Sequence, residues 1–298
     1  MTASSPSIPD PPVWFITGCS SGFGLELALI ALGEGHKVIA TSRNPSKTPS
    51  LVSQVGSLGG KWLPLDVCAP EAELAQTVEK AIAIYGRIDI LVNSAGYAIL
   101  GALETISVEE VRAQMETNYF GPLTLTRLVL PTMRARRSGT IVQISSTAGI
   151  EAKASRSAYC ASKWALEAMS EALYNELEPL GVRVLLVEPG AFRSGFAGAV
   201  NIPKAALPKD YEGTITQQVM DAVVKMGVDE KSIPGDVHKG CRAIFDVVMK
   251  SGQAEGTEEF LRLPLGKDSA KRWRVKIGDL QRTLEGTEKL WSVTDADD

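Results

Sequence analysis

The sequence has few of the residues that build metal centres, disulfide frameworks or membrane spans. Its 298 residues include two histidines and four cysteines, and the cysteines (Cys19, Cys68, Cys160 and Cys241) have no CxxC spacing. A zinc site or a disulfide framework is therefore not expected. The apolar runs fall far short of the roughly 18 residues that cross a membrane. The N-terminus has no basic region followed by an apolar stretch, so we expect no signal peptide.

The chain also lacks a strong excess of either charge. It has 31 Lys and Arg against 35 Asp and Glu, which gives a net charge of −4. A mildly acidic chain is a poor general partner for nucleic acid or an anionic membrane surface. With 44% apolar and 22% charged residues, the composition is that of an ordinary globular protein. These features predict a soluble cytoplasmic protein with free thiols, and they leave its 27 glycines to be explained.

Short runs rich in Val, Ile and Leu alternate with segments that have helical apolar spacing. The runs are mostly continuous, which is typical of parallel strands buried on both faces. Alternation of this kind predicts one α/β domain with a Rossmann-type, doubly wound parallel sheet flanked by helices. The expected strands cover 13–17, 37–42, 61–65, 88–92, 140–145, 182–187 and 259–263, and the expected helices cover 23–34, 71–85, 107–135, 158–179 and 236–251.

The ends of the chain and one internal segment depart from this alternation. Residues 1–12 are rich in Pro and Ser and are predicted to be a disordered tail. The single catalytic domain is expected to span 13–298. Within it, 191–235 contains scattered Gly and Pro and is predicted to be a substrate lid. Residues 267–298, which include a charged amphipathic stretch at 267–291, are predicted to form a C-terminal helical extension.

A glycine-rich turn, Thr17 to Gly24 (TGCSSGFG), joins the first expected strand to the first helix. Such a turn presents backbone N–H groups and the positive end of a helix dipole, which suit a pyrophosphate. The spacing is GxxxGxG rather than GxGxxG. The residues predicted to bind a dinucleotide here are Gly18, Ser20, Ser21, Gly22, Phe23 and Gly24.

The end of the second strand bears on which dinucleotide binds. An acidic residue there would bind a ribose 2′-hydroxyl, whereas an arginine nearby accepts a 2′-phosphate. This chain has Ser42 and Arg43, which favours NADP(H) over NAD(H), although a solvated loop arginine is the ordinary alternative. Asp66 could accept a hydrogen bond from adenine or cap the next helix. Small residues at Asn93-Ser94-Ala95-Gly96 would let a flat cofactor lie against the backbone.

Tyr159 and Lys163 are four residues apart on an expected helix and therefore share a face. A neighbouring ammonium lowers the pKa of a phenol, which would make Tyr159 a proton donor and acceptor near neutral pH. Ser145-Ser146 ends the preceding strand at the same edge of the sheet. Asn118 lies inside the helix expected at 107–135, where it would either hold a water that relays protons to Lys163 or satisfy a helix distortion.

The ordered set of motifs resembles the classical branch of the short-chain dehydrogenase/reductase superfamily. The motifs are TGCSSGFG at 17–24, DV at 66–67, NSAG at 93–96, Asn118, ISS at 144–146, YCASK at 159–163 and PG at 189–190. The resemblance implies that Tyr159 is the general acid/base, that Lys163 lowers its pKa and binds the nicotinamide ribose, and that Asn118 supports a proton relay. Ser146 is chosen over Ser145 because its separation of 13 residues from Tyr159 resembles the family spacing.

The resemblance also implies further contacts. The expected cofactor set adds Val67, Asn93, Ala95, Gly96, Pro189, Gly190, Phe192 and Ser194, and the expected substrate set is Tyr97, Ser146, Tyr159, Phe192 and Phe196. Ser194 stands where the family often has threonine. The motifs NSAGY at 93–97 and RLPLGKD at 262–268 resemble fungal members and members similar to 17β-hydroxysteroid or retinol dehydrogenases.

Together these features predict an NADP(H)-dependent oxidoreductase that interconverts a ketone or aldehyde and an alcohol on a small to medium hydrophobic substrate. A non-catalytic NADP(H)-binding regulator of the same fold is the alternative, but it would not need the Ser, Tyr and Lys set. An epimerase or dehydratase of the extended branch does not match the glycine spacing. The resemblance further implies a homodimer or homotetramer built through the helices at 107–135 and 158–179.

Overall fold

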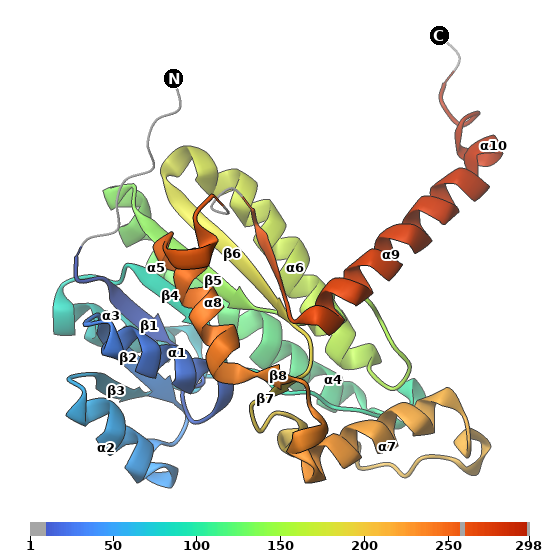
Figure 1. Ribbon diagram of the computed structural model, residues 1–298, viewed down its shortest axis with the longest axis horizontal. Coiled ribbons are helices and arrows are strands. Elements are labelled where there is room, and N and C mark those ends of the chain that lie inside the picture. Colours follow the sequence, from blue (N-terminus) through green and yellow to red (C-terminus); the bar gives the residue numbers. More distant parts are fainter. Residues whose placement is uncertain (1–9, 257–259, 297–298) are drawn as a thin grey trace.

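A computed structural model describes residues 10–256 and 260–296 (Figure 1). Most of the tail expected at 1–12, and part of the strand expected at 259–263, therefore lie outside the described residues. None of the helices within the described ranges is both long enough and apolar enough to cross a membrane.

Seven parallel strands form the central sheet in the order β3-β2-β1-β4-β5-β6-β9. From β1 the strands are added toward one side of the sheet up to β3, and from β4 they are added toward the other side. The point between β1 and β4 is therefore the switch point of a doubly wound fold. The predicted fold class is thus confirmed. The strands are β1 (Val13–Ile16), β2 (Lys37–Ser42), β3 (Lys61–Pro64), β4 (Ile90–Asn93), β5 (Gly139–Ile144), β6 (Val182–Pro189) and β9 (Arg262–Leu265), and β7 (Phe192–Arg193) pairs with β8 (Gly235–Asp236) outside the sheet.

Helices cover both faces of the sheet, as Figure 1 shows. One apolar cluster lies between the sheet and helices α1 and α8, and it includes Leu27, Ile90 and Phe245. The other lies between the sheet and helices α3, α5 and α6. The helices are α1 (Gly22–Gly33), α2 (Pro49–Ser57), α3 (Glu71–Tyr85), α4 (Val108–Met115), α5 (Gly121–Arg136), α6 (Ser157–Leu177), α7 (Ile215–Val228), α8 (Val237–Met249), α9 (Lys267–Gly286) and α10 (Glu288–Trp291).

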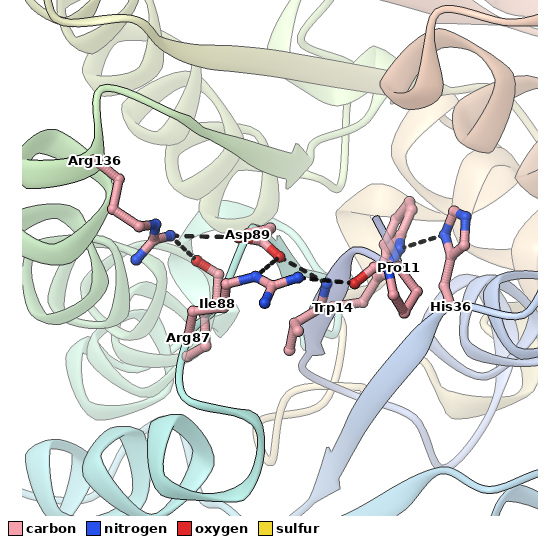
Figure 2. Close-up of polar contacts among 8 residues, drawn as sticks. Pro11, Trp14, His36, Arg87, Ile88, Asp89 and Arg136 are labelled. Carbon is pink, nitrogen blue, oxygen red and sulfur yellow. Dashed lines mark hydrogen bonds and ion pairs between the residues drawn. The ribbon is translucent and has the colours of Figure 1, made fainter. Parts of the chain in front are cut away.

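Asp89 fixes the amino-terminal edge of the sheet (Figure 2). Its carboxylate is buried and accepts hydrogen bonds from the backbone N–H of Val13 at 2.9 Å and from Nε of Arg87 at 2.8 Å. Arg136 of α5 approaches the other carboxylate oxygen at 3.5 Å and donates to the carbonyl of Ile88 at 2.7 Å. This edge is therefore held by a structural ion-pair network, which leaves the opposite, carboxyl edge for ligands.

Two sequence predictions are corrected in detail, and one segment gains a defined helix. The single helix expected over 107–135 is α4 and α5 joined by a π-helical turn at Glu116–Phe120. The strand expected at 259–263 is β9, shifted to Arg262–Leu265. The irregular 191–235 segment contains a regular helix, α7, whose Val223 is buried.

Candidate active site

The glycine-rich turn closely approaches the loop that follows β4. Gly18 has a φ of +72°, and a Cβ at this position would lie 2.8 Å from the Cα of Ala95. Only glycine fits there without displacing the neighbouring backbone. The preceding Thr17 joins the two loops, because its Oγ1 accepts the N–H groups of Ser94 at 2.9 Å and Ala95 at 3.0 Å. Thr17 was not among the predicted site residues, although it begins the glycine motif.

Helix α1 points its amino terminus into this turn. A Cβ on Gly24 would lie 2.7 Å from the carbonyl oxygen of Gly18, so the helix packs directly on the turn. Within the described chain the N-cap residue Ser21 makes no side-chain capping bond, which leaves the first N–H groups of α1 for an anion. The carbonyl of Ser194 lies 3.1 Å from the Cβ position of Gly22. The loop after β6 therefore meets the glycine turn.

The ends of β2 and β3 border one hollow. Arg43 and Asp66 line a cavity of about 240 Å³ together with the first two turns of α3. Ser42 is buried, and its hydroxyl accepts a hydrogen bond from the indole N–H of Trp62 at 3.1 Å. Val67 is also buried, against Gly121 of α5. Arg43 and Asp66 thus share the hollow, while Ser42 faces the side chain of Trp62.

Asn118 lies at the centre of the π-helical turn and is fully buried. Its Nδ2 donates to the carbonyl of Tyr97 and to Oγ of Ser162, both at 3.0 Å, and its Oδ1 accepts from the N–H of Tyr97 at 3.2 Å. Short π-helical segments are frequent at functional sites. Here the turn directs the amide of Asn118 between the loop after β4 and helix α6.

Lys163 extends from α6 to the carboxyl edge of the sheet. Its Nζ donates to the carbonyl of Ile144, the last residue of β5, at 2.8 Å. The Cβ position of exposed Gly96 is 3.2 Å from Oδ1 of Asn118 and 3.7 Å from Nζ of Lys163. The structure therefore brings the predicted Asn118, Lys163 and Gly96 together. Asn93 lies beneath them and donates to Oγ1 of Thr126 at 3.3 Å.

Tyr159 and Ser146 meet through their side chains. The Ser146 hydroxyl lies beside the phenol, close enough to lower its pKa, and accepts from the N–H of Ala148 at 3.1 Å. Ser145 points elsewhere, because its hydroxyl lies beside the carboxyl group of Glu167. Of the two serines, Ser146 is the one that the structure places at the phenol.

Burial controls protonation at this site. It raises the pKa of Tyr159 above the usual value, and the contacts with Ser146 and Arg156 only partly oppose it. Burial also lowers the pKa of Lys163 to about 8. The sequence-based expectation that a neighbouring ammonium lowers the pKa of Tyr159 is therefore wrong for the chain alone. Removal of the phenolate from water destabilises it by more than the nearby groups stabilise it.

The segment expected to be a lid lies beside Tyr159. The ring of Phe196 is 6.0 Å from the Tyr159 ring, centroid to centroid. A small apolar cluster around the phenol joins Leu100 and Ala148 to Val223 of α7, with Met220 packed against it. Phe192 lies elsewhere, 5.3 Å from Phe23 and in contact with α8. Its packing places it behind the glycine turn rather than with Phe196.

A buried carboxyl pair, which the sequence analysis did not identify, lies behind Lys163. Glu167 of α6 and Glu188 of β6 are both buried, and Nε of Arg262 lies 3.3 Å from each carboxyl group. The indole N–H of Trp273 in α9 donates to Glu188 at 2.5 Å. Burial raises the pKa of both carboxyl groups, and for Glu188 the neighbouring Glu167 raises it further. The only sequence signal was the occurrence of these acids within a helix and a strand otherwise expected to be core.

Asp268 in the first turn of α9 holds the backbone after β6. Its Oδ2 accepts the N–H of Ala191 at 2.8 Å. A Cβ on Gly190 would collide with the same carboxylate. Pro189 is buried at the end of β6, and the N–H of Gly190 donates to the carbonyl of Leu265 at 2.9 Å. The start of the C-terminal helix thus fixes the position of the backbone at Gly190 and Ala191, next to the predicted cofactor residues Pro189 and Gly190.

Comparison with known sequences gives matches over most of the chain. The family model described as short chain dehydrogenase matches residues 12–204. "Oxidoreductase claN" of Passalora fulva is 43% identical over 219 residues, which are 73% of this chain and 98% of the relative. A 3-ketodihydrosphingosine reductase of Bacteroides thetaiotaomicron is 42% identical over 282 residues, 94% of this chain and 93% of the relative.

Solved structures share the fold. A short-chain dehydrogenase from Streptomyces avermitilis superposes with a TM-score of 0.84 at 36% identity, covering 96% of this chain and 99% of that one. A serine dehydrogenase complexed with NADP⁺ gives a TM-score of 0.66 at 28% identity, covering 79% of this chain and 88% of that one. A Burkholderia phymatum member in complex with NAD gives 0.70 at 22% identity, with 81% and 86% covered. One of these structural neighbours was therefore solved with NAD and another with NADP⁺.

Proposed function

The chain belongs to the short-chain dehydrogenase family, and from that premise we propose that it is an NADP(H)-dependent oxidoreductase that interconverts a hydrophobic ketone or aldehyde and the corresponding alcohol. The observation that carries the proposal is the placement of Ser146 beside the Tyr159 phenol, with Lys163 bonded to the end of the same strand and lying beside Gly96, at the carboxyl edge of the sheet. A non-catalytic regulator would have no use for that arrangement.

The residues present fit a nicotinamide dinucleotide. The uncapped amino terminus of α1 suits the pyrophosphate, and the absence of a side chain at Gly96 leaves room beside Lys163 for the nicotinamide ribose. Ser20, Ser21 and Ser194 supply hydroxyl groups around the same turn. When bound, the cofactor supplies or accepts the hydride.

The protein residues orient the substrate and move the proton. In reduction, Ser146 and Tyr159 donate hydrogen bonds to the substrate carbonyl, and Tyr159 gives its phenolic proton to the oxygen. The raised pKa of Tyr159 keeps the phenol protonated, as a proton donor must be. Lys163 holds the ribose and is held itself by the carbonyl of Ile144. Asn118 links the loop after β4 to α6 through Tyr97 and Ser162, and it thereby holds their neighbours Gly96 and Lys163 at a fixed distance from each other.

The proposed substrate class follows from the surroundings of the phenol. Leu100, Ala148, Val223 and Phe196 present apolar surface next to Tyr159, which suits a hydrophobic ligand. Tyr97, on the loop after β4, is part of the proposed substrate set. The Bacteroides relative is named as a reductase of 3-ketodihydrosphingosine, which agrees with a carbonyl substrate that has an apolar body.

Replacement of Tyr159 by Phe tests the catalytic assignment. Tyr159→Phe removes the transferable proton, so kcat should fall by at least about 10³-fold, whereas the Kd for NADPH should stay within about 2-fold. The measurements are NADPH consumption over a panel of ketones, quinones and aldehydes, and NADPH fluorescence titration. Tyr85→Phe, on distant α3, is the matched control and should keep full activity. Turnover like that of the wild type in Tyr159→Phe would refute the mechanism.

The preference for NADP(H) rests on Arg43. Because Arg43 and Asp66 border the same hollow, a 2′-phosphate would meet the guanidinium of Arg43. Arg43→Ala should raise KM for NADPH by about 10-fold or more and leave KM for NADH nearly unchanged. Equal effects on the two cofactors would remove the basis for the preference, and Lys47→Ala, in the same exposed loop, serves as the charge control.

The remaining parts of the proposal concern the location of the enzyme in the cell and its oligomeric state. We place it in the cytoplasm, in keeping with four cysteines that are all free. We also infer a homodimer or homotetramer through α4, α5 and α6, where Phe120 and Trp164 are exposed apolar side chains.

A further inference from the structure

Helix α9 projects away from the body of the protein (Figure 1). Its first turns are fixed, because Ser269 donates to the carbonyl of Glu188 at 2.8 Å and Trp273 donates to the carboxyl group of the same residue. Lys276 lies over the ring of Trp164, 5.4 Å from its centroid. In the described chain beyond Lys276, the side-chain hydrogen bonds of α9 and α10 join residues of these helices to one another.

An apolar stripe runs along this projecting part. Ile277, Leu280, Leu284 and Trp291 are between 46% and 59% exposed. Ile277, Leu280 and Leu284 have the three- and four-residue spacing of the seam of a coiled coil and continue the line of Trp273, and Trp291 follows on α10, after the break at Thr287. Val275, also 48% exposed, lies on the opposite face of the helix. A lone helix of this length is marginal in water, and its stability normally comes from packing of its apolar face.

Charge along the helix changes sign from base to tip. Residues 267–278 carry five basic side chains and one acidic, whereas residues 279–296 carry four acidic and two basic. Two such helices side by side in parallel would place like charges together, whereas an antiparallel pair centred on Leu284 places Asp279 against Lys289 and Asp295 near Arg274. The stripe also fits a symmetric pair, because Ile277 and Trp291 are equally far from Leu284.

We propose that this stripe is an interface between two copies of the chain, with their α9–α10 segments antiparallel and a two-fold axis beside Leu284. The tip of each helix then reaches the base of the other, where Trp164 is 43% exposed next to Lys276. A lipid surface fits less well, since the stripe is narrow and the tip is acidic, whereas interfacial helices have a broad apolar face and basic flanks. Apart from Trp164 on α6, this interface shares no named residue with the one inferred through α4, α5 and α6, and it does not depend on the proposed reaction.

The assembled mass tests the proposal. In sedimentation velocity over about 1–100 µM protein, Leu280→Asp/Leu284→Asp should have half the assembled mass of the wild type, and Val275→Asp should match the wild type. Both variants should keep turnover per chain, because the changed residues lie outside the site. A seam variant with the wild-type mass, or a wild type that is monomeric throughout, would overturn the proposal.

Cross-linking tests the antiparallel geometry. In a Cys68→Ser background, Leu284→Cys should form an inter-chain disulfide under mild copper–phenanthroline oxidation, while Ile277→Cys and Val275→Cys should not. Equal cross-linking at 277 and 284 would indicate parallel helices and refute the model of the pair. Sedimentation of the wild type with phosphatidylcholine–phosphatidylserine vesicles, lost in Leu280→Asp/Leu284→Asp and without a cross-link at 284, would assign the stripe to a membrane instead.

Discussion

Lys163 carries a large electrostatic cost at the candidate site. The residue is 5% exposed, and its ammonium group donates a hydrogen bond to the carbonyl of Ile144. Burial lowers its pKa from 10.5 to about 8, so in the folded chain the ammonium is held at the expense of stability below that pH. Active sites often contain such residues, because function requires a group that the fold alone would not choose.

Replacement of Lys163 by Met should therefore stabilise the protein while abolishing activity. At pH 7 the gain should be about 3 kcal/mol, because burial lowers the pKa of Lys163 from 10.5 to about 8. Because the folded pKa lies below the unfolded pKa, the unfolded wild type binds more protons between pH 8 and 10.5, and its stability rises with pH there. The advantage of Lys163→Met should accordingly shrink across that range. Urea unfolding at pH 7 and 9.5 measures both values, and Lys153→Met, at a partly exposed lysine, is the control.

At this scale the sequence identified the polar residues well and their environment poorly. The spacing of Ser146 from Tyr159 selected the serine that contacts the phenol, and Ser145 lies beside Glu167 as a strand residue would. The direction of the Tyr159 pKa shift was wrong, because motif spacing reports which charges are near and not how much water is removed. Whether each predicted contact binds cofactor or substrate stays a prediction.

At the scale of the helices and strands, Arg262 on β9 is a charge that joins elements. It lies between the carboxyl groups of Glu167 on α6 and Glu188 on β6, and it also reaches Glu171 at 2.8 Å. One guanidinium therefore joins a helix and two strands. Without it, two buried carboxyl groups that already have raised pKa values would face each other uncompensated, which is the costly form of a buried ion pair.

Arg262→Met should reduce stability by about 3 kcal/mol at pH 8 and by clearly less at pH 5. An acid whose folded pKa is above its unfolded value loses stability as pH rises from the unfolded value through the folded one, so the deficit grows over this window. Urea unfolding at the two pH values measures it. Addition of Glu188→Gln should recover much of the loss at pH 8. A deficit that is the same at both pH values would show that Arg262 acts by packing alone.

The elements themselves were largely predictable because strands and helices alternate with clear periodicity. The bounds of α3 agree with the prediction, and β1, β2, β5 and β6 agree within one or two residues. The π-helical turn at Glu116–Phe120 was not predictable from apolar spacing, since one extra residue in a helix is fixed by tertiary contacts such as those of Asn118 with Tyr97 and Ser162. Helix α7 was hidden by the Gly and Pro residues on either side of it.

At the scale of the whole molecule, the C-terminal segment has two parts with different attachments. Up to Lys276 it holds the body, because β9 completes the sheet, Asp268 fixes the backbone at Ala191, and Trp273 bonds to Glu188. Beyond Lys276 it projects outward and exposes the stripe. The sequence showed a charged amphipathic tail but not the point where it leaves the body, because that point depends on contacts with β6 and α6.

Two truncations should separate these parts. A chain that ends at Lys276 keeps Asp268 and Trp273, so its melting temperature, its Kd for NADPH and its turnover per chain should match those of a full-length chain whose stripe is disrupted by Leu280→Asp/Leu284→Asp.

A chain that ends at Gly266 loses the support of Gly190 and Ala191 beside the proposed nicotinamide site, and its Kd for NADPH should rise by about 10-fold or more. Asp268→Ala in the full chain isolates that single contact and should weaken NADPH binding in the same direction with a smaller fall in melting temperature. Unchanged NADPH affinity in both the Gly266 truncation and Asp268→Ala would show that the backbone after β6 holds its position without α9.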